Sequence, residues 1–207
     1  MDSKKSKNDG AANSSPFFNI KTDIMLKFSL VFCLILSFCF SVNAQYTLNS
    51  NTSNMYIDGT SSLHDWTETI EDMSGSLNVD LADNAIAKVK MLSISIPVSS
   101  IKSGKSGMDK NTYVALNSKD YPNIKFALKS YAKGKNSLTL TGNLTISGTT
   151  KLVKIKSVYE VKSNSIEVEG KHTFKMSEFG VEPPTAMMGT IKTGDEITIR
   201  FNLVFDK

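Results

Sequence analysis

The amino-acid sequence predicts an all-β protein, an antiparallel β-barrel of about eight strands with one short helix in a long loop. From Met55 onward, apolar and polar side chains alternate with a period of two, which gives each strand one apolar face. Short turn clusters separate the later strands, as in hairpins. No predicted helix is long enough to cover the apolar faces, so the sheet must curl to bury them.

The first segment of the chain has the features of a signal peptide. An apolar run of about fifteen residues covers 28–42 and is preceded by Lys27, a length typical of a signal-peptide core and short for a membrane-spanning helix. Val42 and Ala44 stand at the two positions that a signal peptidase reads. We therefore expect cleavage near Ala44-Gln45 and a protein that is periplasmic or secreted.

Met25 stands directly before Leu26-Lys27, which favours a translation start at this methionine. We expect residues 1–24 to be an over-called start or a disordered extension, residues 25–44 to be the signal peptide, and residues 45–207 to form the barrel domain. A lipoprotein needs a small residue before its modified cysteine, whereas Phe32 precedes Cys33 and Phe38 precedes Cys39. This pattern does not favour lipid attachment.

The expected mature domain has no cysteine and a nearly balanced charge. Both cysteines fall in the predicted signal peptide, so disulfides, thiol catalysis and cysteine metal sites are not expected. The net charge after Ala44 is about +2 with the signs interspersed, which makes nucleic acid a poor candidate partner. The length is that of one domain with a full-sized core.

The predicted strands follow the alternating pattern along the chain. They cover 54–63, 67–81, 86–98 and 123–132, and then segments around 138–146, 153–161, 166–176 and 197–205. The apolar parity switches between Met91 and Leu92, which predicts a bulge there. Turn clusters at 133–136, 147–150 and 163–165 connect the later strands as an antiparallel meander.

Two segments interrupt this pattern. Ser106 and Asp109 form the Ser-x-x-acid pattern that begins a helix, and we expect that helix to end at Asn117. The segment 178–194 contains Pro183 and Pro184, which exclude it from a central strand. Its apolar residues must cover something, and both a lid across the barrel mouth and packing on the outside of the barrel remain open.

Several blocks of sequence resemble the YceI-like family of periplasmic lipid-binding proteins. The matching stretches are 96–101 (IPVSSI), Met108-Asp109, 116–118 (LNS), 121–126 (YPNIKF), 140–153 (LTGNLTISGTTKLV) and 174–180 (FKMSEFG), together with 59–66 (GTSSLHDW). The resemblance covers nearly all of residues 46–206. It implies an extended lipocalin-like barrel that holds a polyisoprenoid or a similar long amphiphile, without a cofactor of its own.

This chain departs from the family pattern at two places. The family usually has an Arg-Asp pair where this chain has Met108-Asp109, and an arginine near the final Phe-Gly where this chain has Ser177-Glu178. A headgroup contact through those arginines therefore does not carry over to this sequence.

The stretch that contains His64, Asp65 and Trp66 allows several interpretations. Catalysis would require a nucleophile beside the imidazole, but Ser61 and Ser62 are neighbours on a strand and point to opposite faces. Metal binding would need His64 and His172 to meet across the barrel with Asp65 as a third ligand, and two histidines without a cysteine fall short of the usual zinc ligand set. The structural alternative places His64-Asp65 at a strand end, with the carboxylate accepting backbone amides and the indole N–H bonded at one end of the barrel.

His172 has the parity of an inward-facing residue. A buried imidazole without a partner costs about 1–3 kcal/mol, so we expect it to bond a strand neighbour or Tyr159, or else a polar group of the ligand. The inward glycines Gly142 and Gly170 leave room inside the barrel for a ligand.

The function favoured by the sequence is non-enzymatic binding, storage or transport of a polyisoprenoid or isoprenoid-quinone-like lipid, with transient membrane contact. Alternatives are a lipid-ester hydrolase using His64 and Asp65, and a filled barrel acting as an interaction module. No catalytic or metal-ligating residue is assigned. The predicted ligand-binding residues are Trp66, Ile94, Ile96, Phe126, Leu128, Leu140, Leu144, Val153, Ile155, Tyr159, His172, Phe174, Met176, Ile199 and Phe201.

Overall fold

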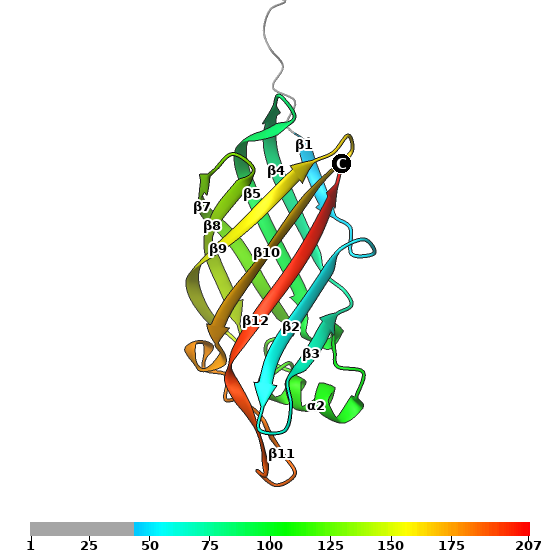
Figure 1. Ribbon diagram of the computed structural model, residues 1–207, viewed down its shortest axis with the longest axis vertical. Helices are drawn as coiled ribbons and strands as arrows, with labels where there is room; N and C mark the ends of the chain where they lie inside the picture. The colour runs from blue at the N-terminus through cyan, green and yellow to red at the C-terminus, as the bar shows by residue number, and fades with distance from the viewer. Residues whose placement is uncertain (1–43) are drawn as a thin grey trace, which may run out of the picture. The chain divides into compact units, whose positions relative to one another are not determined.

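The computed structural model describes residues 44–207, which form a β-barrel with one α-helix (Figure 1). The predicted extension at 1–24 and all but the last residue of the predicted signal peptide lie outside this range. No helix in the described range is long and apolar enough to cross a membrane. The strands are β1 (Ala44–Leu48), β2 (Asn54–Ser61), β3 (Trp66–Ile70), β4 (Ser74–Ala82), β5 (Ala85–Pro97), β6 (Ile101–Lys102), β7 (Asn123–Lys133), β8 (Ser137–Ile146), β9 (Thr149–Val161), β10 (Ser165–Lys175), β11 (Thr185–Ala186) and β12 (Ile191–Asp206). The helical segments are η1 (Val98–Ser100), α2 (Ser106–Ala115) and η2 (Met176–Phe179).

Eight of the described strands close into an antiparallel barrel. Their order is β1, β4, β5, β7, β8, β9, β10 and β12, and β12 returns to β1 with Leu48 opposite Phe205. The strands β7 to β10 follow one another as hairpins, as the turn clusters predict. The predicted all-β barrel of about eight strands with one short helix is confirmed.

Strands β2, β3 and β6 extend the barrel wall at one end. β12 is the longest strand of the described range, and one of its edges pairs with β1 near Asp206 and with β2 between Thr193 and Asn202. β3 pairs with the other edge of β2, and β6 pairs with β3. In Figure 1 this extension leads toward α2 and the β11–β12 hairpin, away from the C-terminus.

The predicted strand 67–81 was wrong in one respect, because the chain forms two strands there. Between β3 and β4 the backbone turns a corner, where the amide of Glu71 donates to the carbonyl of Ser100 at 2.9 Å and the Ser100 hydroxyl donates to the carbonyl of Asp72 at 2.8 Å. β3 pairs with β2 and β6, whereas β4 pairs with β1 and β5. The short strands β1, β6 and β11 were also not predicted from the sequence.

Helix α2 begins at Ser106 as predicted, but with a different cap. Lys105 occupies the capping position and makes no side-chain cap bond. The carboxylate of Asp109 instead accepts the backbone amide of Ser103 at 2.7 Å and its hydroxyl at 2.6 Å. Asn117 follows the helix with a positive φ of 48°, which fits an asparagine at a helix end.

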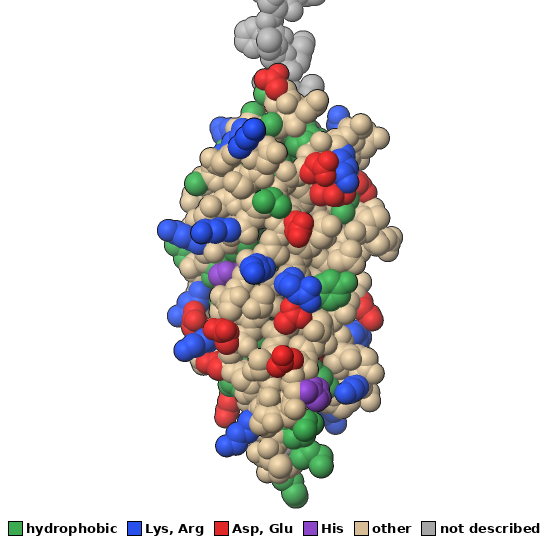
Figure 2. Space-filling view, viewed as in Figure 1, with side chains coloured by type: hydrophobic (Ala, Val, Ile, Leu, Met, Phe, Trp, Pro, Cys, Tyr) green, Lys and Arg blue, Asp and Glu red, His purple; other side chains and the backbone are tan. Residues whose placement is uncertain are grey.

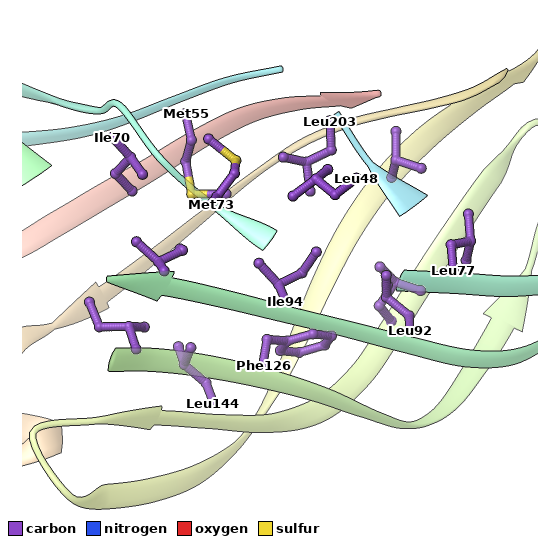
Figure 3. Close-up of a cluster of buried hydrophobic side chains, with 14 of the residues drawn as sticks. Leu48, Met55, Ile70, Met73, Leu77, Leu92, Ile94, Phe126, Leu144 and Leu203 are labelled. Atoms are coloured by element: carbon purple, nitrogen blue, oxygen red, sulfur yellow. The ribbon is translucent and has the colours of Figure 1, made fainter. Parts of the chain in front are cut away.

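The inward faces of the strands build the core, as the alternation predicts. In β8 the buried side chains are at alternate positions, including Leu138, Leu140, Leu144 and Ile146. Figure 3 shows such side chains from strands around the barrel converging on its interior. The predicted bulge near Met91 is present, because Met91 lies opposite Asn78 while Val89 lies opposite Val79. Lys90 is therefore the additional residue.

Candidate functional site

A cavity of about 710 Å³ lies at the end of the barrel that carries α2. Its lining comes from segments far apart in the sequence: β2, β3 and their connection, β6, α2 with its flanks, single residues of β7 and β8, the segment 174–185, and the first half of β12. Most lining side chains are apolar, and they include Ile57, Trp66, Ile101, Leu116, Ile124, Ile146, Phe174, Phe179, Val181 and Ile197. A volume of this size and an apolar wall are typical of sites that hold a small organic molecule.

A second, smaller cavity continues into the barrel. Its volume is about 80 Å³, and Ile124 and Ile199 line both cavities. The remaining lining residues are apolar except for His172, and they include Leu92, Leu140, Leu144, Val168, Leu203 and Phe205. An elongated apolar molecule in the larger cavity would therefore point its far end at this smaller one.

The inward glycines do not leave room for a ligand, contrary to the sequence-based expectation. A Cβ atom on Gly142 would lie 2.4 Å from the ring of Phe126, and one on Gly170 would lie 2.7 Å from the ring of Phe201. The two aromatic rings therefore occupy the space that the glycines provide. Because both rings also line the smaller cavity, they narrow the barrel at that level.

Glu68 is a buried acid in the wall of the larger cavity. It lies on β3 opposite Ile57, is only 2% exposed, and accepts a hydrogen bond from the Thr112 hydroxyl of α2 at 2.7 Å. Burial raises the pKa of its carboxyl, the bond from Thr112 lowers it, and the charge of Asp109 raises it further. No ion pair to Glu68 occurs among the described residues.

The GTSSLHDW stretch forms the end of β2, a turn and the start of β3. The indole N–H of Trp66 donates to the carbonyl of Thr60 at 2.9 Å, and the ring covers Gly59, where an added Cβ would lie 2.2 Å away. The Ser61 hydroxyl donates to the carbonyl of His64 at 2.8 Å and accepts the amides of Leu63 and His64. Ser61 thus makes the corner bonds that the sequence analysis assigned to Asp65.

This arrangement does not resemble a catalytic triad. The Ser61 hydroxyl contacts the backbone of His64 and not its imidazole. The imidazole Nδ1 lies 2.6 Å from the backbone carbonyl of Asp65, and no bond joins it to the Asp65 carboxylate. Among residues 44–207, no three His, Cys, Asp or Glu side chains gather where a metal ion would bind.

The segment after β10 forms part of the wall of the larger cavity. Phe179 and Val181 are buried, and both line the cavity with Pro184 and Ile191. Phe179 packs edge-on against Phe174 with 5.1 Å between ring centroids. This placement favours the lid interpretation over packing on the outside of the barrel, although residues 191–194 belong to β12.

The tip of this segment projects beyond the cavity. Figure 2 shows hydrophobic side chains gathered at that end of the barrel, and Met187 and Met188 are 73% and 107% exposed. Both residues have positive φ angles, 52° and 58°. The β11–β12 hairpin therefore carries its apolar tip into solvent.

His172 faces inward as predicted, but neither a strand neighbour nor Tyr159 bonds its ring, and a bond to a polar group of the ligand stays a prediction. Its Nε2 atom is buried without a partner in the described part of the protein, and its ring stacks on Phe174 at 5.5 Å. The hydroxyl of Tyr159 instead donates to the carbonyl of Lys135 at 3.4 Å. Burial lowers the pKa of His172, and the charge of Glu178 opposes that effect.

The comparisons with known proteins agree with this geometry. A model of the YceI-like domain matches residues 46–205. The chain belongs to the YceI-like family. It is 25% identical over 163 residues to a Pseudomonas putida protein named UPF0312 protein, covering 72% of this chain and 82% of that relative.

Two solved structures show the same YceI-like fold. BcnA of Burkholderia cenocepacia matches with a TM-score of 0.66 and 21% identity, over 76% of this chain and 98% of BcnA. A polyisoprenoid binding domain from Saccharophagus degradans, implicated in plant cell wall breakdown, matches with a TM-score of 0.63 and 13% identity, over 78% of this chain and 97% of that domain. The family resemblance and the barrel fold expected from the sequence are thereby confirmed.

The predicted ligand-binding residues of this YceI-like chain separate into three groups. Trp66, Phe174, Met176 and Ile199 line the larger cavity. The smaller cavity is lined by Ile94, Ile96, Phe126, Leu140, Leu144, Ile155, His172, Ile199 and Phe201. Leu128, Val153 and Tyr159 pack in or against the core and line neither cavity.

Neither the polar part of the site nor the cavity-lining residues of α2 were predicted from the sequence, although the helix itself was. Glu68 falls on an apolar strand face, so its charge was the signal available. Met108, Thr112 and Ala115 of α2 line the cavity, as does Leu116 directly after the helix, and none of the four was predicted as a ligand-binding residue. The spacing of four and three residues between Met108, Thr112 and Ala115 places these three on one helical face, which is the signal that the sequence offers.

Proposed function

We propose that this YceI-like protein is an exported, non-enzymatic carrier that holds a polyisoprenoid or isoprenoid-quinone-like lipid in its barrel. The observation that carries the proposal is the apolar cavity of about 710 Å³ at the barrel mouth, continued inward by the smaller one. Export is supported by the signal-peptide pattern at residues 25–44. The similarity in fold to the polyisoprenoid binding domain of Saccharophagus degradans supports the ligand class.

The energetics of the cavity favour recognition through the tail. Burial contributes about 0.8 kcal/mol per CH₂, so each five-carbon prenyl unit contributes roughly 3–4 kcal/mol before ordering costs. A few buried units therefore outweigh a single headgroup hydrogen bond. A passive carrier also fits the contacts of Ser61 and His64, which lead to backbone carbonyls.

Native mass spectrometry of protein purified without detergent, followed by lipid extraction, tests the proposal. We expect a bound lipid with a prenyl tail. Ala115→Phe should reduce its occupancy, because Ala115 lines the cavity. Val114→Phe is the matched control, since Val114 lies on the same helix and is 72% exposed. A stably empty protein that also takes up no prenylated lipid would contradict the proposal.

N-terminal sequencing of the exported protein tests the predicted processing separately. A mature chain that begins at Gln45 is expected.

A further inference from the structure

We propose that Glu68, together with Thr112, recognises the polar end of the lipid and selects a hydrogen-bond donor, such as a hydroxyl or an ammonium group, over a phosphate or a carboxylate. This inference rests on the proposed function and specifies the class of lipid that the cavity takes.

Glu68 lies where its carboxylate can accept a hydrogen bond from a ligand in the cavity. Its side chain lines the larger cavity, and the residue is nearly inaccessible to solvent. The Thr112 hydroxyl donates to Oε1 at 2.7 Å and fixes the carboxyl beneath α2. A carboxylate accepts several hydrogen bonds, so a ligand donor can join Thr112 there.

When Glu68 is ionised, its surroundings leave the negative charge poorly compensated. Thr112 is neutral, and the nearby charge that acts on Glu68 is that of Asp109, which is also negative. Hydrogen bonds to an ionised acceptor are about twice as strong as neutral ones, and a cation beside a buried carboxylate gains further. A phosphate in the same place would add a like charge in a region of low dielectric constant.

The basic residues at the mouth of the cavity favour an anionic ligand. Their exposed charges act on the ligand more weakly than the charge of the buried Glu68. Lys105, Lys110 and His64 line the cavity, and all three are exposed. Solvent and salt screen such charges, whereas Glu68 is shielded from both. The buried charge should therefore decide the selectivity for a head that enters the cavity.

The test compares three probes that differ only in their polar end: geranylgeraniol, geranylgeranylamine and geranylgeranyl phosphate. Binding to delipidated protein near neutral pH is followed through the emission of Trp66, the single tryptophan, which lines the cavity. We expect the alcohol and the amine to bind at least about tenfold more tightly than the phosphate. Glu68→Gln should shrink the preference of amine over phosphate by about tenfold.

Glu71→Gln is the matched control, because Glu71 is a neighbouring but exposed glutamate, and it should leave the ranking unchanged. If the phosphate binds the wild-type protein as tightly as the alcohol, the inference is overturned while the carrier function stands. The same holds if Glu68→Gln folds and keeps the wild-type ranking, since the lysines at the mouth would then set it. If no probe binds, the carrier function and this inference fail together.

Discussion

At the scale of single residues, Glu68 places an ionisable group where burial disfavours its charged form. Its pKa is raised above the ordinary value of 4.5, mainly by burial. Between that value and the raised one, the folded state binds more protons than the unfolded state. The stability that this group contributes is therefore present below pH 4.5 and is lost as the pH rises through the folded-state pKa.

Glu68→Gln should remove this part of the pH dependence. Urea unfolding of the delipidated protein between about pH 5 and about pH 8 measures the free energy of unfolding. The wild-type protein should lose more stability over this range than the variant, and Glu71→Gln should follow the wild type. Parallel profiles for wild type and Glu68→Gln would contradict the assignment.

The contribution of His172 to stability depends on pH in the opposite direction to that of Glu68. Burial lowers its pKa below 6.5, so the unfolded chain takes up a proton first as the pH falls. Stability from this group is present above pH 6.5 and is lost as the pH falls through the folded-state pKa. An imidazole nitrogen without a hydrogen-bond partner also carries a desolvation cost at every pH.

His172→Phe should therefore raise the free energy of unfolding of the delipidated protein by about 1–3 kcal/mol near neutral pH. The loss of stability on acidification below pH 6.5 should also become smaller. Urea unfolding at two pH values measures both effects. His64→Ala, at an exposed imidazole, should change stability by less than about 0.5 kcal/mol. A clearly destabilised His172→Phe would show that the nitrogen has a partner.

Residue parity predicts which side a side chain faces, but not which atoms it meets. His172, Phe174 and Tyr159 all face inward as the alternation requires. Tyr159, one of the partners expected for His172, does not bond it, because the Tyr159 hydroxyl reaches the Lys135 carbonyl. Which hydrogen-bond partner an inward side chain meets depends on distances across the barrel. The sequence of a single strand does not contain those distances.

At the scale of the elements, periodicity predicted the long strands and failed where an element is short or bent. β8 and β10 keep one alternating pattern throughout and match the prediction. β1 has only five residues and begins at the predicted cleavage site, so it offered little periodicity. The corner at residues 71–73 is held by contacts with Ser50 and Ser100, which belong to other parts of the chain.

Pairs of glycine and aromatic residues shape the barrel wall. Gly59 lies beneath Trp66, Gly142 beneath Phe126 and Gly170 beneath Phe201. In each pair the ring fills the space above a residue without a side chain, a device that stabilises glycine within sheets. Local sequence shows the glycines and the aromatics, but their pairing follows from strand register.

Gly142→Ala should destabilise the protein by about 1–3 kcal/mol, since its Cβ would force the Phe126 ring to move. Thermal or urea unfolding measures the loss. Gly107→Ala is the control, because a Cβ at Gly107 would meet no atom within 4 Å and alanine favours the helix. That variant should be as stable as the wild type or more so. An equally stable Gly142→Ala would show that the ring moves freely.

At the scale of the whole molecule, the cavity exists because segments distant in sequence meet at one end of the barrel. β12 supports both β1, which closes the barrel, and β2, which extends it. α2 and the segment 176–194 then bound the extended end. The sequence predicted the barrel and an apolar interior, but the larger cavity lies at this end and depends on long-range packing that no local pattern contains.

This placement predicts how ligand binding should depend on tail length. A ligand that binds only the folded state stabilises it by an amount that grows with the logarithm of the ratio of free ligand concentration to Kd, about 2.7 kcal/mol at a ratio of 100. For a domain of this size, that corresponds to a rise in Tm of roughly 5–10 °C. Because tail burial dominates the affinity, the rise should grow from geraniol to farnesol to geranylgeraniol at equal free concentration.

Thermal unfolding with each of the three alcohols measures this dependence. The increase should become smaller once the tail has filled the larger cavity, since the rings of Phe126 and Phe201 narrow the path beyond it. In Ala115→Phe the rise in Tm should stop growing at a shorter tail, because the added ring fills part of the larger cavity. Val114→Phe should behave as the wild type. Equal shifts for all three alcohols in every variant would place the lipid on the outer surface, and the cavity would then not be the binding site.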